Sequence, residues 1–171
     1  MGSAAVVFGV QNLRYPAAVA PPVKMDMKWY DGIKKPRWNP PKWAFPAVWI
    51  PLKLMQVASL FLVLKKTGFS GRAVLPFSIF GAHLLLGNRW NVIFFGEHKL
   101  RRSLDYMAIF YGSIAATAAA FYPISPAAAV LMMPTQVWVT IAAALNYSIV
   151  QLNKDSPDPS FDKPSAPAPA S

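Results

Sequence analysis

The chain has 171 residues, of which 54% are hydrophobic and only 14% are charged, and its formal net charge is +10. Because soluble domains carry about 25% charged residues, this composition is typical of a membrane protein. The chain contains no cysteine, which excludes disulfides, cysteine-ligated metal centres and a cysteine nucleophile.

Residues 1–28 are not expected to form a spanning segment. Their apolar run, at 3–10, is too short to cross a bilayer, and polar residues and three prolines follow it. We expect these residues to be either the remnant of a targeting peptide or an arm that lies on the membrane surface.

Residues 29–43, which we call the Trp-rich segment, hold three tryptophans, one tyrosine, three prolines and four lysines or arginines. Pro36, Pro40 and Pro41 forbid a continuous helix. The sequence therefore predicts an ordered loop at the level of the lipid headgroups. Such a loop is either an interfacial aromatic belt or a lid over the helices that follow.

Four apolar windows follow the Trp-rich segment. They cover residues 44–64, 73–95, 106–122 and 127–153. Only two formal charges, Lys53 and Arg89, fall inside them, although the chain has 17 basic and 7 acidic residues. Since a spanning helix needs about 20 apolar residues, we predict an all-α, polytopic transmembrane bundle of four antiparallel helices. Residues 154–171 are rich in Pro, Ser and Ala, which predicts a disordered tail.

The basic residues are distributed unevenly about the four windows. The side that holds both chain ends and the loop 96–105 carries twelve Lys or Arg residues, and the opposite side carries three. The positive-inside rule therefore places both termini and the Trp-rich segment on the cytoplasmic or stromal-equivalent side. Because these residues flank apolar spans, we expect them to meet the anionic headgroups of a lipid bilayer and not nucleic acid.

Two rows of residues at helical spacing are candidate ligand-facing surfaces. The second window has His83, Gly87, Trp90 and Phe94 at i, i+4, i+7 and i+11, and the last window has Pro134, Trp138, Ala142 and Asn146 spaced by four. Indole rings stack on flat ligands and offer one hydrogen-bond donor each, so the two rows suit a planar hydrophobic ligand beneath the Trp-rich segment. Alternatively, both rows are helix–helix contacts in which Gly and Ala permit close approach.

Four ionisable residues call for an interpretation. His83, near the middle of its window, either bonds to a neighbouring helix or serves as the axial ligand of a haem or chlorophyll. Lys53 and Arg89 have no acidic partner within their windows, so they either snorkel to the headgroups or meet an anionic ligand inside the bundle. His98 lies in a loop and is expected to be solvated.

Three motifs in order carry a resemblance to a known family. They are Trp29-Tyr30 with the residues 35–45 and Trp49, then residues 90–95 (Trp-Asn-Val-Ile-Phe-Phe), then Met133-Pro134, Trp138 and Leu145-Asn146-Tyr147. Over residues 29–153 the chain resembles the TspO/MBR family, the tryptophan-rich sensory proteins that include the mitochondrial translocator protein. The family has five transmembrane helices, which implies that this chain lacks the first.

The chain also departs from the family pattern at several polar positions. Lys53 stands where the family has Tyr, and Thr135 also replaces a Tyr. His83 and Gly87 stand where the family has Gln and Asn. These substitutions fall in the set of residues that faces the ligand in the family, so the resemblance implies the fold more directly than the ligand.

The resemblance implies a ligand site built from residues of the Trp-rich segment and three helices. Its members are Trp29, Trp38, Trp43, Phe45, Trp49, Lys53, His83, Gly87, Trp90, Phe94, Trp138, Ala142 and Asn146. The implied ligand is a tetrapyrrole, sterol or isoprenoid, which includes a haem, porphyrin or chlorophyll-type pigment, bound for transport, sensing or scavenging.

The sequence is also compatible with two other roles. The first is a structural subunit of a larger membrane complex, or a homodimer, with a partner on the side left open by the missing helix. The second is an enzyme acting on a lipophilic pigment, and the sequence disfavours it because no Ser-His-Asp order, HExxH motif or phosphate loop is present. The resemblance further implies an organellar membrane, plastid or mitochondrial.

Overall fold

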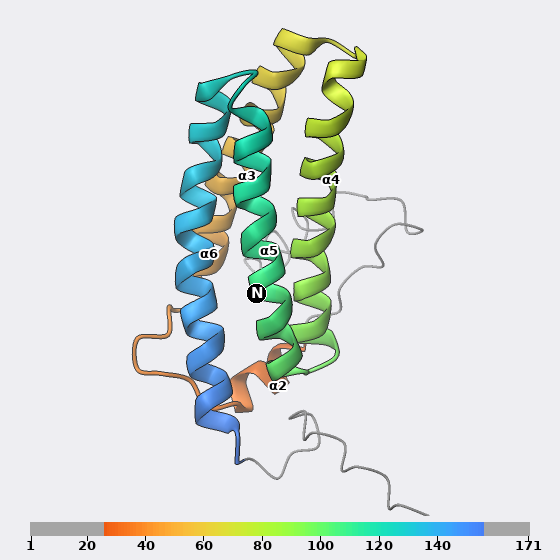
Figure 1. Cartoon of the computed structure of the whole chain (residues 1–171). Helices are drawn as coiled ribbons and strands as arrows, with labels where there is room; N and C mark the ends of the chain where they lie inside the picture. The colour runs from red at the N-terminus through yellow and green to blue at the C-terminus, as the bar shows by residue number, and fades with distance from the viewer. Residues whose placement is uncertain (1–25, 156–171) are drawn as a thin grey trace, which may run out of the picture.

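The computed structural model describes residues 26–155, and every regular element in that range is a helix. The elements are α2 (Met27–Gly32), α3 (Ala44–Thr67), α4 (Gly71–Asn91), the π-helix η1 (Val92–Gly96), α5 (Leu100–Phe121) and α6 (Pro126–Asn153). Four long helices run alongside one another, and α2 lies at one end of the bundle (Figure 1). The predicted all-α bundle is confirmed, whereas the arm predicted at 1–28 and the tail predicted at 154–171 fall almost entirely outside the described residues.

The observed helices match the predicted spans but differ at their ends. The largest difference is in α5, which begins at Leu100 and not at the predicted residue 106. Arg101, Arg102 and Asp105 end the apolar window, yet charged side chains do not interrupt backbone hydrogen bonding, so the helix runs on past the hydrocarbon. The predicted connection 96–105 is correspondingly shorter.

Three of the described helices, α3, α5 and α6, are long and apolar enough to cross a membrane. The remaining long helix, α4, has 21 residues, which corresponds to about 32 Å of helix and matches the thickness of a bilayer core. It is more polar than the others because it contains His83, Asn88 and Arg89. The prediction that α4 is a fourth span therefore rests on its length and on its place in the bundle.

The helices pack in the order α4, α5, α6 and α3. Each of the three adjacent pairs in this order makes extensive contacts, whereas α3 and α4 touch one another at few points. These two helices are joined by a short connection at one end only. The described bundle therefore has an open side between them, which we call the α3/α4 side.

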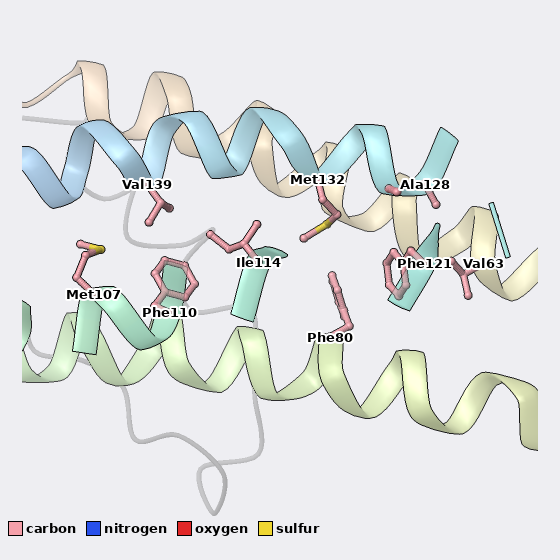
Figure 2. Packing of buried hydrophobic residues seen from close by; sticks show 10 residues of the cluster. Val63, Phe80, Met107, Phe110, Ile114, Phe121, Ala128, Met132 and Val139 are labelled. Atoms are coloured by element: carbon pink, nitrogen blue, oxygen red, sulfur yellow. The ribbon is translucent and has the colours of Figure 1, made fainter. Parts of the chain in front are cut away.

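The apolar core runs along the middle of the bundle. It contains Phe80 of α4, Phe110, Ile114 and Phe121 of α5, and Met132 and Val139 of α6 (Figure 2). The rings of Phe80 and Phe121 stack with their centroids 5.9 Å apart. Because lipid tails are as apolar as these side chains, the core stabilises the bundle through close van der Waals packing.

Hydrogen bonds between side chains or from side chain to backbone also tie neighbouring helices together. The hydroxyl of Ser59 on α3 donates to the carbonyl of Ala128 on α6 across 2.7 Å. On the other side of α6, the Nδ2 of Asn146 lies 3.1 Å from the hydroxyl of Ser103 on α5. These four residues are buried. Because the bilayer core offers no water to bond to, each of these bonds satisfies polar groups that would otherwise be unpaired.

Gly87 allows α4 and α5 to approach closely. A Cβ atom at this position would lie 2.8 Å from Cε2 and 3.0 Å from Cζ of Phe110. The ring of Phe110 therefore occupies the space beside Gly87, which supports the interpretation of this residue as a helix–helix contact.

The replacement Gly87→Ala tests this contact. We expect it to destabilise the bundle by about 1–3 kcal/mol, because the ring of Phe110 must shift out of a packed core. Gly81→Ala is the matched control, since nothing lies within 4 Å of a Cβ at Gly81 on the same helix. Thermal unfolding in detergent measures both, and equal midpoints for the two variants would contradict the packing role of Gly87.

Candidate functional site

The Trp-rich segment begins in α2 and is held by a dense set of hydrogen bonds. The carboxylate of Asp26 accepts from the backbone N–H of Trp29 across 3.0 Å and caps the start of α2. At the other end of α2, the ammonium of Lys35 donates to the carbonyls of Tyr30, Asp31 and Ile33. The predicted loop is therefore ordered, although its first part is a short helix.

The phenol of Tyr30 ties α2 to the loop that follows it. It is buried, and its hydroxyl donates to Oδ1 of Asn39 across 3.1 Å. Burial raises the pKa of this phenol above its ordinary value, against the opposing effect of the bond to Asn39. The ring thus stays neutral at physiological pH and serves as an apolar anchor for the segment.

Asn153, at the C-terminal end of α6, ties the Trp-rich segment to the bundle. Its Oδ1 accepts from the N–H of Lys34 across 3.0 Å, and its Nδ2 donates to the carbonyl of Lys34 across 2.8 Å. The two residues are 119 positions apart in the chain. This pair of bonds, which we call the Asn153 latch, holds the segment over the end of the four-helix bundle.

Trp29 lies between the loop before α5 and the end of α4. Its indole stacks on the imidazole of His98 with centroids 4.3 Å apart, and it meets Phe94 edge-on at 5.7 Å. Nε2 of His98 is 3.7 Å from the carboxylate of Asp26. The expectation that His98 is solvated is wrong, because stacking on Trp29 leaves only 26% of its side chain exposed.

Trp90 and Phe94 stack on one another at the junction of α4 and η1, with centroids 5.3 Å apart. The π-helix adds a residue to the turn, so Phe94 leaves the straight row that the 3.6-residue spacing predicts. It is buried beside Tyr30 under the Trp-rich segment. Trp90 contacts both this aromatic cluster and the main core.

The other two tryptophans of the Trp-rich segment lie on its outside. Trp38 is 49% exposed and Trp43 is 72% exposed. Both rings are thus available to the headgroup region, as in an interfacial aromatic belt. In the described structure only Trp29 points into the cluster that covers the helix ends.

A second group of candidate residues lies along α3 and α6. Phe45, in the first turn of α3, meets Trp138 of α6 edge-on at 6.3 Å. One turn further along α3, Trp49 packs against the core, and the ammonium of Lys53 lies 5.8 Å from the centre of its indole. These residues bring aromatic rings from α3 and α6 together below the Trp-rich segment.

His83 is completely buried between α4 and α5. Its ring stacks on Phe110 at 5.2 Å, and Nδ1 is 3.4 Å from the hydroxyl of Ser113. A haem plane needs open space at the coordinating nitrogen, and the imidazole has none, with an exposed fraction of 0%. This packing does not fit axial ligation of a haem or chlorophyll by His83.

The row of Pro134, Trp138, Ala142 and Asn146 does not face one neighbour. Residues spaced by four rotate by about 40° at each step, so the row winds around α6. Pro134 is exposed, Trp138 meets α3, and Asn146 is fully engaged with Ser103 of α5. Ala142 packs against the core, so Ala142 and Asn146 act as helix–helix contacts in this structure.

Arg89 points towards the end of the bundle where α2 lies. Its guanidinium pairs with the carboxylate of Glu97 across 2.8 Å. Glu97 follows η1 and lies outside the apolar windows. This pairing agrees with the interpretation that Arg89 snorkels. Lys53 is the other charged residue within the apolar windows.

Five buried polar atoms of this region have no hydrogen-bond partner within the described residues. They are the indole Nε1 atoms of Trp29, Trp90 and Trp138 and the Nε2 atoms of His83 and His98. Buried polar atoms are nearly always paired, so the unpaired indole donors of Trp90 and Trp138 mark places where an acceptor belongs. His83 differs from them, because its imidazole has no open space beside it. The indole of Trp90 lies against Phe94, and that of Trp138 lies against Phe45 of α3.

The sequence as a whole matches known proteins over most of its length. The model of the TspO/MBR family matches residues 4–152. The chain belongs to the TspO/MBR family. It is 33% identical over 143 residues to the tryptophan-rich sensory protein of Cereibacter sphaeroides, which covers 84% of this chain and 87% of that protein. It is also similar to the translocator protein of Homo sapiens, with 36% identity over 72% of this chain and 73% of that protein.

A third relative, protein CrtK of Rhodobacter capsulatus, is 33% identical over 73% of this chain and 78% of that protein. The match to the TspO/MBR family confirms the resemblance derived from the three motifs. It also extends that resemblance to residue 4, ahead of the Trp-rich segment. The expected loss of the first family helix concerns residues that lie outside the described range.

Several residues that shape this site were not predicted from the sequence. Asn153, Gln56, Ser103 and His98 hold the segment and the helices in place, yet none belongs to a motif. The sequence does carry a signal for Gln56 and Asn153, because a Gln or Asn inside an apolar window must find a hydrogen-bond partner. The identity of that partner depends on which helices are neighbours.

The Asn153 latch can be tested by Asn153→Ala. We expect this variant to lower the stability by about 1–3 kcal/mol, because the backbone groups of Lys34 lose their partners. Amide hydrogen exchange at residues 33–35 should become faster than in the parent protein. Ser148→Ala on the same helix is the control, since its hydroxyl bonds only to Ala144 within α6. Unchanged exchange at Lys34 would show that the latch is not needed.

Proposed function

We propose that this integral membrane protein binds a flat hydrophobic ligand below the Trp-rich segment. The site lies next to Trp90 of α4, Trp138 of α6 and the first turns of α3. The role is one of binding and not of catalysis, in keeping with a sequence that carries no catalytic motif.

The observation that carries this proposal is the pair of buried indole N–H groups of Trp90 and Trp138. An indole nitrogen is a donor only, so each requires an acceptor. Leaving such a donor buried without a partner costs about 1–3 kcal/mol, which a ligand with acceptor atoms at its edge would recover. The rings beside these donors provide flat surfaces on which such a ligand stacks.

The ligand class that suits this arrangement is a tetrapyrrole, a sterol or an isoprenoid. Each is largely apolar, and a tetrapyrrole or a sterol also carries polar atoms at its edge. The names of the relatives, translocator protein and tryptophan-rich sensory protein, describe transport and sensing for those proteins. We extend these roles, together with scavenging, to this chain.

We further propose that the protein resides in an organellar membrane. The excess of basic residues beside α2, before α5 and after α6 favours an orientation with this end on the cytoplasmic or stromal-equivalent side. The Trp-rich segment would then control access to the site from that side.

A structural subunit of a larger membrane complex is the second candidate. The α3/α4 side favours it, because two neighbouring helices of the described bundle leave much of their facing surfaces uncovered. A partner helix laid along that side would complete the ring of contacts.

Ligand binding is tested with the purified full chain in detergent, titrated with protoporphyrin IX or cholesterol. Trp138→Phe and Trp90→Phe each keep an aromatic ring but remove the indole donor. We expect roughly a two- to tenfold loss of affinity, the effect of one hydrogen bond. The Soret absorption reports porphyrin binding, and radiolabel counting reports cholesterol.

Tyr122→Phe serves as the control, because it removes a polar hydrogen from an exposed ring at the end of α5. Its affinities should equal those of the parent protein. If the parent binds neither ligand and purifies in a fixed ratio with another membrane protein, the subunit role replaces the proposed one.

A further inference from the structure

Lys53 is a positive charge set deep in a membrane helix. It lies nine residues after Ala44, the first residue of α3, which places it about 14 Å along the helix. Lys is rare at such a depth, because its ammonium loses hydration there, and it is commonly functional where it occurs.

The Lys53 side chain does not extend towards the nearer headgroups. Its Nζ donates to Oε1 of Gln56 across 3.3 Å, and Gln56 lies one turn further from the start of α3. Gln56 is itself buried, and its Nε2 donates to the hydroxyl of Thr135 on α6 across 3.1 Å. A snorkelling lysine would run the opposite way, so these bonds hold the ammonium at its depth.

No carboxylate among residues 26–155 is placed to neutralise this charge. The seven acidic residues are Asp26, Asp31, Glu97, Asp105, Asp155, Asp158 and Asp162. The five of them that the structure describes all lie at the end of the bundle that holds α2, and none forms an ion pair with Lys53. Residues 1–25 contain neither Asp nor Glu, so they offer no counter-charge either.

Lys53 lies beside the face of α3 that meets α6. The buried residues of α3 recur at Leu52, Gln56, Ser59 and Val63, and two of them, Gln56 and Ser59, bond to α6. Lys53 follows Leu52 by one helical step of about 100°, and it is exposed in the described structure. The ammonium therefore lies off the buried face of α3, beside the indole of Trp49.

We propose that Lys53 binds the carboxylate of an amphipathic ligand whose flat apolar body stacks beside Trp49. This inference rests on the proposed function and narrows its ligand class from flat hydrophobic molecules to flat carboxylic acids. Gln56 positions the ammonium, since it is anchored on α6 through Thr135. A carboxylate at this depth forms a charge-assisted bond that water does not weaken, whereas the neutral analogue leaves the ammonium unpaired.

The test compares acids with neutral analogues on two different skeletons. The probes are protoporphyrin IX against its dimethyl ester, and cholesteryl hemisuccinate against cholesterol, each titrated into the full chain in nanodiscs of neutral lipid. We expect the parent protein to bind an acid about tenfold or more tightly than its neutral analogue. If the protein prefers the acid only on the porphyrin skeleton, the ligand is assigned as a tetrapyrrole acid. If it prefers the acid on both skeletons, the negative charge of the ligand is the main feature that the site recognises.

Lys53→Gln should abolish the preference by lowering the affinity for the acid about tenfold or more while leaving that for the neutral analogue unchanged. Lys53→Arg should retain most of the preference, because it keeps the charge. Lys65→Gln is the matched control, as it removes a lysine from the exposed opposite end of the same helix. Retained binding of the neutral analogue shows that each variant is folded.

The outcomes separate this inference from the proposed function. Equal binding of acid and neutral analogue by the parent protein overturns the carboxylate site and leaves the ligand-binding role standing. A preference that survives Lys53→Gln also overturns it. Failure of the parent to bind any of the four probes contradicts the ligand-binding role itself.

Discussion

Hydrocarbon offers no hydrogen bonds, so every polar group between the two faces of the membrane must find its partner within the protein or in a ligand. In this bundle that constraint is met largely in pairs, one residue from each of two helices. Ser59 bonds to the backbone of α6, Gln56 bonds to Thr135, and Asn146 bonds to Ser103. Each pair fixes how one helix is rotated against its neighbour. The indole donors of Trp90 and Trp138 and the ammonium of Lys53 matter because they do not follow this pattern.

The Trp-rich segment obeys the same constraint at the membrane surface by other means. Its prolines have no N–H group to satisfy, and the carbonyls left free at the end of α2 are bonded by Lys35. Asn39 accepts a bond from Tyr30 of α2, and Asn153 of α6 bonds to the backbone of Lys34. The result is a covering whose shape depends on the bundle beneath it.

Apolar windows predicted the four long helices because hydropathy follows directly from the lipid surroundings. They did not predict the first turns of α5, since Arg101 and Asp105 end an apolar window without ending a helix. The stack of Trp90 on Phe94 follows from local spacing along one helix. The roles of Gly87 and Asn146 do not follow from local spacing, because their partners, Phe110 and Ser103, lie on another helix. Spacing along a helix identifies a shared face but not the neighbour that the face meets.

The Asn153 latch bears on the order in which the protein acquires its structure. The acceptor and donor that hold Lys34 reside on the last residue of the last helix, 119 positions downstream. Contacts so distant in sequence form late, and during synthesis this one must wait until the ribosome has made the entire bundle. Within the described residues, the attachment of the Trp-rich segment to α6 therefore forms late, and until α6 has been translated this segment is held only by its contacts with earlier parts of the chain.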